Sequence, residues 1–124
     1  RQVEWMDLDV YGHVNNVIYF NYAEEAAAQD FAARGWSPAK LAESNLTIAT
    51  RRAHIQYLSI ASWGETLNIS THMLNASDTS GSRYVGMTRA DGSLVAECII
   101  DWEFVDRKSG EARPWPEELR REFV

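Results

Sequence analysis

The chain is poor in the residues that build disulfides, metal sites and membrane spans. Its 124 residues include one cysteine, Cys98, which excludes an internal disulfide. The three histidines are scattered, and no Cys/His cluster has zinc-ligand spacing. No apolar stretch approaches the roughly 20 residues needed to cross a bilayer, and no signal segment opens the sequence. We therefore expect a cytoplasmic protein with no membrane association, no metal and no cofactor.

Positive charge is also scarce. Eighteen acidic residues outnumber twelve basic ones, which gives a formal net charge of −6. Nucleic acid is not an expected partner, because phosphate neutralisation needs a basic stripe and the sequence has none. Four arginines fall on segments that alternate like strands: Arg51, Arg52, Arg83 and Arg89. A few of these residues could hold the phosphates of a small anionic ligand, although a solvated strand edge is the commoner role for any single one.

The length and composition fit one compact domain over residues 1–124. A long helix is predicted from about Asn16 to Arg34, ending at Gly35, where a left-handed cap is expected. Apolar residues surround this helix instead of forming one stripe, which predicts a helix buried inside the fold. A second helix is predicted from Ser37, a good cap, to Glu43.

From Leu46 onward apolar and polar residues alternate with period two, which is typical of half-buried antiparallel strands. Glycine-containing turns separate the alternating runs and predict hairpins. One strand is expected from Thr47 to Leu58, with its apolar face made by Ala49, Ala53, Ile55 and Tyr57. The alternating segment 1–5 is a further candidate strand, and Cys98 is expected in the core. The element order predicts an α+β fold in which one antiparallel β-sheet wraps around one long central helix.

The residues with the clearest chemistry lie directly before the long helix. The run from Asp7 to Asn16 holds a second acid, a glycine, a histidine and two asparagines. A helix start has unpaired N–H groups and the positive end of the helix dipole, so it favours negative charge beside it. A carboxylate at such a place suits attack on a carbonyl, as nucleophile or as general base.

The stretch Asp7 to Glu25 resembles the signature of the 4-hydroxybenzoyl-CoA thioesterase-like branch of the hotdog-fold superfamily, in the form D-x-D-x-x-G-H-V-N-N-x-x-Y-x-x-Y. Segments 64–67 and 102–114 also lie where that family has similar elements, so the similarity spans essentially the whole chain. A similar D-L-D-V-x-x-H-V-N-N block occurs in plant-type fatty acyl-ACP thioesterases. The resemblance implies a hotdog fold and hydrolysis of an acyl-CoA or acyl-ACP thioester, as in fatty acid metabolism.

The resemblance also implies roles for single residues. Asp9 matches the catalytic aspartate, and the backbone N–H near Asn16 matches the group that polarises the thioester carbonyl. His13 matches a histidine implicated in catalysis in the plant-type enzymes; hydrogen bonding to the loop backbone is the alternative of nearly equal weight. Some bacterial relatives have a catalytic histidine at the position of Asn16, and this chain departs from that pattern. Asp7 is expected to be structural, and Asn15 to cap the helix.

Substrate contacts are expected from the loop, the helix and the first long strand, through Gly12, Tyr11, Asn15, Tyr19, Arg51 and Arg52. Gly12 allows a sharp turn or a close approach to the ligand, while the tyrosines suit either a pocket for an acyl group or simple packing. The resemblance implies a homodimer or homotetramer with its site at the subunit boundary. Two other functions stay open at this point: a hotdog dehydratase or hydratase, and a non-catalytic module that binds acyl thioesters.

Overall fold

The computed structural model describes residues 1–123. In chain order the elements are the 3-10 helix η1 (Trp5–Asp7), α1 (Asn16–Ala33), α2 (Pro38–Glu43), β1 (Leu46–Tyr57), β2 (Asn68–Ala76), β3 (Ser80–Thr88), β4 (Leu94–Asp106) and α3 (Glu117–Arg120). The predicted order of one long helix, one short helix and antiparallel strands is confirmed. In the described part of the chain, no helix is both long and apolar enough to span a membrane.

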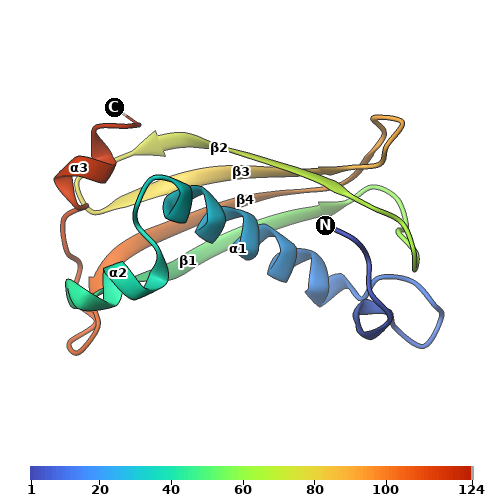
Figure 1. Cartoon of the computed structure of the whole chain (residues 1–124), viewed down its shortest axis with the longest axis horizontal. Helices are drawn as coiled ribbons and strands as arrows, with labels where there is room; N and C mark the ends of the chain where they lie inside the picture. The colour runs from blue at the N-terminus through green and yellow to red at the C-terminus, as the bar shows by residue number, and fades with distance from the viewer. Residues whose placement is uncertain (124) are drawn as a thin grey trace.

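The strands form one antiparallel sheet in the order β1-β4-β3-β2, so β1 and β2 are its edges. The sheet bows around α1, which lies across its inner face (Figure 1). That inner face and α1 enclose the core. At the end of the core beside α3 lies an aromatic cluster made of Phe31, Trp102, Phe104, Trp115 and Phe123. Cys98 is buried in the core as predicted, and burial raises the pKa of its thiol to about 11.

The ends of α1 and α2 follow from local chemistry. The Asn15 side chain accepts a hydrogen bond from the Val17 N–H at 3.1 Å, and the Ser37 hydroxyl accepts one from the Lys40 N–H at 3.2 Å. Both are the N-cap bonds that the sequence predicts. After α1 the chain turns through Gly35, whose φ of +89° lies in the left-handed region.

Only one face of α1 is buried in this chain. Tyr19, Tyr22, Ala23 and Phe31 are buried against the sheet, whereas Val17 is 67% exposed. The prediction of a helix buried on all sides is therefore wrong for a single chain, because one sheet can cover only one face of a helix. The uncovered face is apolar in part, and within the described residues nothing packs on it.

β1 contains a β-bulge after Thr50 that the sequence pattern does not predict. Ala49 pairs with Glu103 on the outer face of β4, whereas Ala53 pairs with Ile100 on the inner face. The prediction that Ala49 and Ala53 share a face is wrong, because the bulge adds one residue and reverses the alternation.

The alternating segment 1–5 does not form the strand expected of it. Gln2 makes a single antiparallel bridge to Thr66, and η1 begins at Trp5. The Asp7 carboxylate accepts the Glu4 N–H at 3.0 Å, which turns the chain into η1 before a ladder can extend.

Candidate active site

A tight loop places Asp9 close to the start of α1. Leu8 and Val14 pair as an antiparallel bridge, and the Asp9 N–H donates to the His13 carbonyl at 2.7 Å. Gly12 has a φ of +79°, a left-handed conformation that strains any residue with a Cβ. The sequence thus folds locally into a turn that brings His13 back beside Asp9.

The Asp9 carboxylate is fixed through one of its two oxygens. Oδ1 accepts the N–H of Tyr11 at 2.8 Å and the N–H of His13 at 3.2 Å. Oδ2 has no hydrogen-bond partner among the described residues. The two backbone donors hold the carboxylate in one orientation, and the second oxygen stays available to a ligand or to water.

The first turn of α1 supplies a free donor. The Val17 N–H is capped by the Asn15 side chain, and the Asn15 N–H donates to the Asp7 carbonyl at 2.9 Å. Between them, the Asn16 N–H has no acceptor within residues 1–123. It is one of the unpaired N–H groups that every helix start presents, and it is the type of donor that stabilises an oxyanion.

A cleft of about 560 Å³ joins the loop, the helix start and the end of β1. It is lined by Asp9, His13, Val14, Asn16, Tyr19, Tyr57, Leu58, Ser59 and Ile60. The structure therefore brings all three predicted catalytic residues to one cleft, together with Tyr19 from the predicted substrate contacts. His13 bonds to Asp9 through its backbone, and its half-buried side chain lines the cleft.

Two tyrosines form one wall of this cleft. The hydroxyl of Tyr19 accepts the Ala61 N–H at 3.3 Å, and its ring meets that of Tyr57 edge-on with centroids 5.5 Å apart. Burial raises the pKa of Tyr19. The Tyr57 hydroxyl donates to the Asn16 carbonyl at 3.2 Å. Tyr57 was predicted only as part of the apolar strand face; its contact with the helix start joins segments 41 residues apart, which no local pattern indicates.

The segment that follows Tyr57 is anchored by an ion pair. Arg89 Nε donates to Glu65 at 2.8 Å, and its Nη atoms donate to the Ser59 hydroxyl and the Ile60 carbonyl. The hydrogen bond from Arg89 holds the pKa of Glu65 below its usual value. These contacts fix the segment that follows β1. The sequence offered Arg89 only as one of four arginines that could hold an anionic ligand, and it did not identify Glu65.

Asp7 has the structural role expected of it. It is 5% exposed, and it accepts the Tyr22 hydroxyl at 2.5 Å as well as the Glu4 N–H. Arg1 lies 3.7 Å from the same carboxylate. Burial and the bond to Asp7 raise the pKa of the Tyr22 hydroxyl. Asp7 therefore joins η1 to α1 beneath the Asp9 loop.

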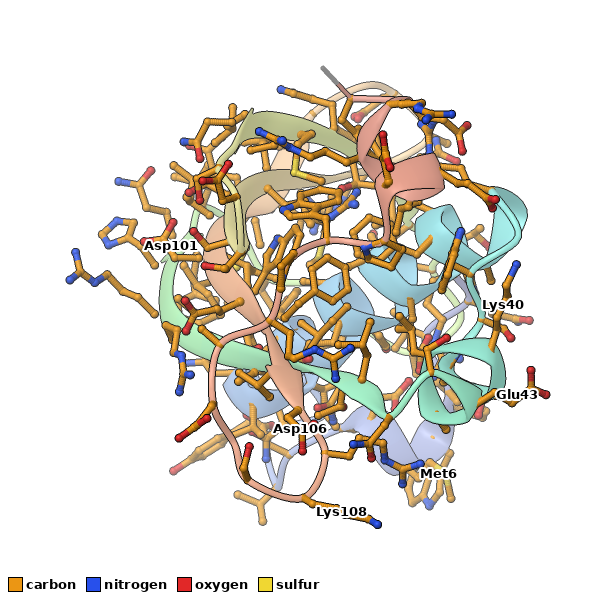
Figure 2. All side chains as sticks on the ribbon, turned by 90° about the vertical axis from the view of Figure 1, so that its left-hand side faces the viewer. Met6, Lys40, Glu43, Asp101, Asp106 and Lys108 are labelled. Atoms are coloured by element: carbon orange, nitrogen blue, oxygen red, sulfur yellow. The ribbon has the colours of Figure 1, made fainter. Side chains whose placement is uncertain are left out.

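Other predicted substrate contacts lie outside the cleft. The Tyr11 side chain is 79% exposed and contributes only its backbone N–H to Asp9. Arg51 and Arg52 line a separate depression that also includes Asp101, and Arg51 pairs with Glu103 at 2.9 Å. Figure 2 shows Asp101 on the other side of the molecule from α2. Within one chain, then, the structure does not bring the two arginines to Asp9, and their role in binding substrate stays a prediction.

The surface around the cleft is rich in exposed apolar side chains. Trp5 and Trp63 meet edge-on with ring centroids 5.8 Å apart, and both are more than 60% exposed. Met6, in η1, is also exposed and is labelled in Figure 2. In residues 1–123, no three His, Cys, Asp or Glu side chains are grouped so as to hold a metal ion.

The antiparallel sheet wrapped around one long helix is the hotdog fold. A family model described as the thioesterase-like superfamily matches residues 3–123, and the chain belongs to that superfamily. The predicted family, the hotdog fold and thioester hydrolase activity are thereby confirmed.

Individual relatives agree with this assignment. The chain is 28% identical over 126 residues to the long-chain acyl-CoA thioesterase FadM of Escherichia coli (strain K12), covering 98% of this chain and 92% of that protein. Slr0204, a 1,4-dihydroxy-2-naphthoyl-CoA thioesterase from Synechocystis, shares the fold with a TM-score of 0.91 and 18% identity, over 99% of this chain and 91% of that one. SAV2348 from Staphylococcus aureus, solved in complex with CoA, has a TM-score of 0.92 and 16% identity, over 98% of this chain and 77% of that one.

Proposed function

We propose that this protein hydrolyses an acyl-CoA thioester to a free acid and CoA, with Asp9 as the reacting carboxylate. The observation that carries the proposal is the shared cleft of Asp9 and Asn16. Asp9 has one unbonded carboxylate oxygen, and the Asn16 N–H has no acceptor within the described chain. Bound there, a thioester carbonyl would accept the Asn16 N–H, which would stabilise the oxyanion by about 3 kcal/mol.

Two routes use this geometry. As a general base, Asp9 takes a proton from water, the water oxygen attacks the carbonyl carbon, and the C–S bond breaks to release the thiol. As a nucleophile, Asp9 attacks the carbonyl carbon and expels the thiol, and water then cleaves the mixed anhydride. A single turnover in H₂¹⁸O identifies the second route if label appears in Asp9. The label enters the released acid directly by the first route, and enters the Asp9 carboxylate when water attacks the aspartyl carbonyl in the second.

The proposed substrate is a fatty acyl-CoA, and acyl-ACP is the alternative. Support for CoA comes from the long-chain acyl-CoA activity in the name of FadM and from the CoA bound to SAV2348. The cleft itself offers aromatic and aliphatic walls from Tyr19, Tyr57, Leu58 and Ile60, which suit an apolar acyl group. Rates on a panel of short to long acyl-CoAs, aryl-CoAs and one acyl-ACP decide between them. A cytoplasmic location stays a prediction.

Replacing Asp9 by asparagine tests the proposal directly. Asp9→Asn keeps an acceptor for the Tyr11 and His13 N–H groups but removes the base and nucleophile, so thiol release should fall by at least about 100-fold with the fold retained. Asp78→Asn, in the turn between β2 and β3, is the matched control, because its side chain is 92% exposed. Unchanged turnover in Asp9→Asn would remove Asp9 from the mechanism. A dehydratase or hydratase would instead interconvert an enoyl-CoA and a hydroxyacyl-CoA without releasing thiol. A binding module would release no thiol either.

The active form is proposed to be a homo-oligomer, a dimer or a tetramer. β1 is a 12-residue strand at the edge of the sheet, with one side unpaired in the described chain. The uncovered face of α1 and the apolar surface around the cleft are the kind of area that a second copy covers. Sedimentation at assay concentration checks this, and a fully active monomer would contradict it.

A further inference from the structure

A second cavity, of about 330 Å³, lies toward the opposite end of α1 from the Asp9 cleft. It is bounded by the second half of α1, by α2, by the start of β1 and by the inner face of the sheet. Figure 1 shows α2 at this end of the molecule, away from the N-terminal loop. No residue lines both cavities. Glu24 is the lining residue of α1 nearest to Asn16, about 12 Å along the helix at 1.5 Å per residue.

Arg83 is the polar residue buried beside this cavity. It is 1% exposed, and it lies on β3, from which it lines the cavity. Nη1 donates to Asp30 at 2.9 Å and to the Thr71 hydroxyl at 3.0 Å, and the guanidinium lies 5.0 Å from the centre of the Phe31 ring. Nη2 is buried and has no acceptor among the described residues. Since buried polar groups are nearly always hydrogen-bonded, this free donor needs an explanation.

Asp30 holds Arg83 through a single hydrogen bond. One Asp30 oxygen accepts Arg83 Nη1, and the other accepts Arg34 Nε at 3.1 Å. The carboxylate is therefore shared between two arginines, whereas an arginine with its own carboxylate commonly makes two parallel hydrogen bonds. Burial lowers the pKa of Arg83 and Asp30 opposes this, but an arginine keeps its charge. Arg34 also pairs with Glu122 at 3.2 Å, so the two arginines and two carboxylates balance in charge, and what remains for an anion is the unbonded Nη2 donor of Arg83.

The rest of the cavity is apolar. Its walls include Ala27 and Phe31 of α1, Leu41 of α2 and Ile48 of β1. Glu24 and Arg107, both exposed, also line it and have opposite charges, so Arg83 determines which charge is preferred inside. The volume lies at the lower end of the range for small-molecule sites, about 300–1,000 Å³, which suits a short chain and is too small for CoA.

We propose that this cavity binds a free medium-chain monocarboxylic acid, with its carboxylate on Arg83 Nη2 and its chain among the apolar walls. The site goes beyond hydrolysis in the Asp9 cleft, since it takes an acid of the product class at a separate place. Its ligand needs a free carboxylate, so an acyl-CoA of the same length does not satisfy it.

Calorimetry on the full chain with three eight-carbon probes tests which head group the cavity binds. Octanoate should bind, 1-octanol should bind at least ten-fold more weakly, and octylamine should not bind, because only the first places an anion on Arg83. Octanol binding as tightly as octanoate would overturn the proposal, as would no binding of octanoate.

Substitutions in α1 and β3 test whether octanoate binds in this cavity. Ala27→Leu fills the cavity without changing charge and should abolish octanoate binding, whereas Ala33→Leu, an exposed position of α1 that does not line the cavity, should not. Arg83→Met removes the donor, and circular dichroism checks its folding. Equal octanoate affinity in the two alanine variants would overturn the site.

Asp9→Asn separates this proposal from the proposed function. This variant should bind octanoate like the wild type, and octanoyl-CoA should not displace the acid from it. Loss of octanoate binding in Asp9→Asn, or displacement by octanoyl-CoA, would place the acid in the catalytic cleft and overturn the second site. Neither result depends on whether the wild type turns over acyl-CoA.

Discussion

Tyr57 at the end of β1 donates its hydroxyl hydrogen to the carbonyl oxygen of Asn16, the first residue of α1. The bond joins the wall of the cleft to the helix turn that presents the free N–H. It therefore makes Tyr57 a positioning residue for the proposed oxyanion donor. Removing this single hydrogen bond tests that role.

Removing this one hydroxyl should slow the reaction without weakening substrate binding. Tyr57→Phe keeps the ring against Tyr19 and loses one neutral hydrogen bond, so we expect kcat to fall about two- to ten-fold and KM to change little. Steady-state kinetics on one acyl-CoA measures both constants. Tyr84→Phe, which loses a bond to Glu97 on the outer face of the sheet, is the control and should leave kcat unchanged. A rise in KM alone in Tyr57→Phe would instead indicate a binding contact.

Asp7 should matter for stability. In Asp7→Asn the buried Tyr22 hydroxyl and the Glu4 N–H lose a charged acceptor, so we expect the free energy of unfolding to fall by about 2–3 kcal/mol. Urea denaturation at neutral pH measures it as a lower midpoint. Asp78→Asn provides the comparison, because the side chain of Asp78 is 92% exposed and its loss should change stability by less than about 0.5 kcal/mol. Equal effects of the two variants would show that Asp7 is not a structural anchor.

The turn at Gly12 should matter for both stability and rate. A Cβ at Gly12 would meet nothing within 4 Å, so the cost of Gly12→Ala is the left-handed backbone itself, about 1 kcal/mol. Relief of that strain would move Asp9 and lower kcat. Gly110 has a φ of +75° and equally open surroundings in the turn after β4, so Gly110→Ala should lose similar stability and keep its kcat. The same kcat in both variants would contradict a role for the loop geometry.

The Glu65–Arg89 pair should give stability that acid removes. The pKa of folded Glu65 is lowered from its ordinary value of 4.5, chiefly by the hydrogen bond from Arg89, so folding favours the ionised form. That contribution is present above about pH 4.5 and is lost as pH falls through the lowered pKa. Because both side chains are partly exposed, we expect Glu65→Gln to cost at most about 1 kcal/mol at pH 7 and progressively less below pH 4.5. Denaturation curves across this range measure the difference, and a difference that grows in acid would be the contrary result.

Local features of the fold could be predicted from the sequence, and distant ones could not. The cap at Asn15 and the turn at Gly12 depend on neighbouring residues only. The face of Ala49 could not be predicted, because the bulge in β1 is defined by pairing with β4. The candidate site residues in the loop could be named because the loop resembles a family signature. The contact of Tyr57 with the helix start could not be predicted, because it forms only when the chain folds.

The buried position of Arg83 could have been predicted from the alternation of residues along β3. Arg83 alternates with Val85 and Met87, both fully buried on the inner face of β3, so period-two spacing places a cation in the core. What spacing could not reveal is the sharing of Asp30 between two arginines. That sharing depends on which turn of α1 lies over β3.

The bulge in β1 has a consequence for how copies of this chain can associate. A long, straight edge strand is a template on which further chains can add without limit, as in fibrils. The bulge after Thr50 interrupts the ladder and increases the local twist, so the two halves of the edge cannot present one flat, continuous row of donors and acceptors. A continuous edge-to-edge polymer along β1 is thereby disfavoured.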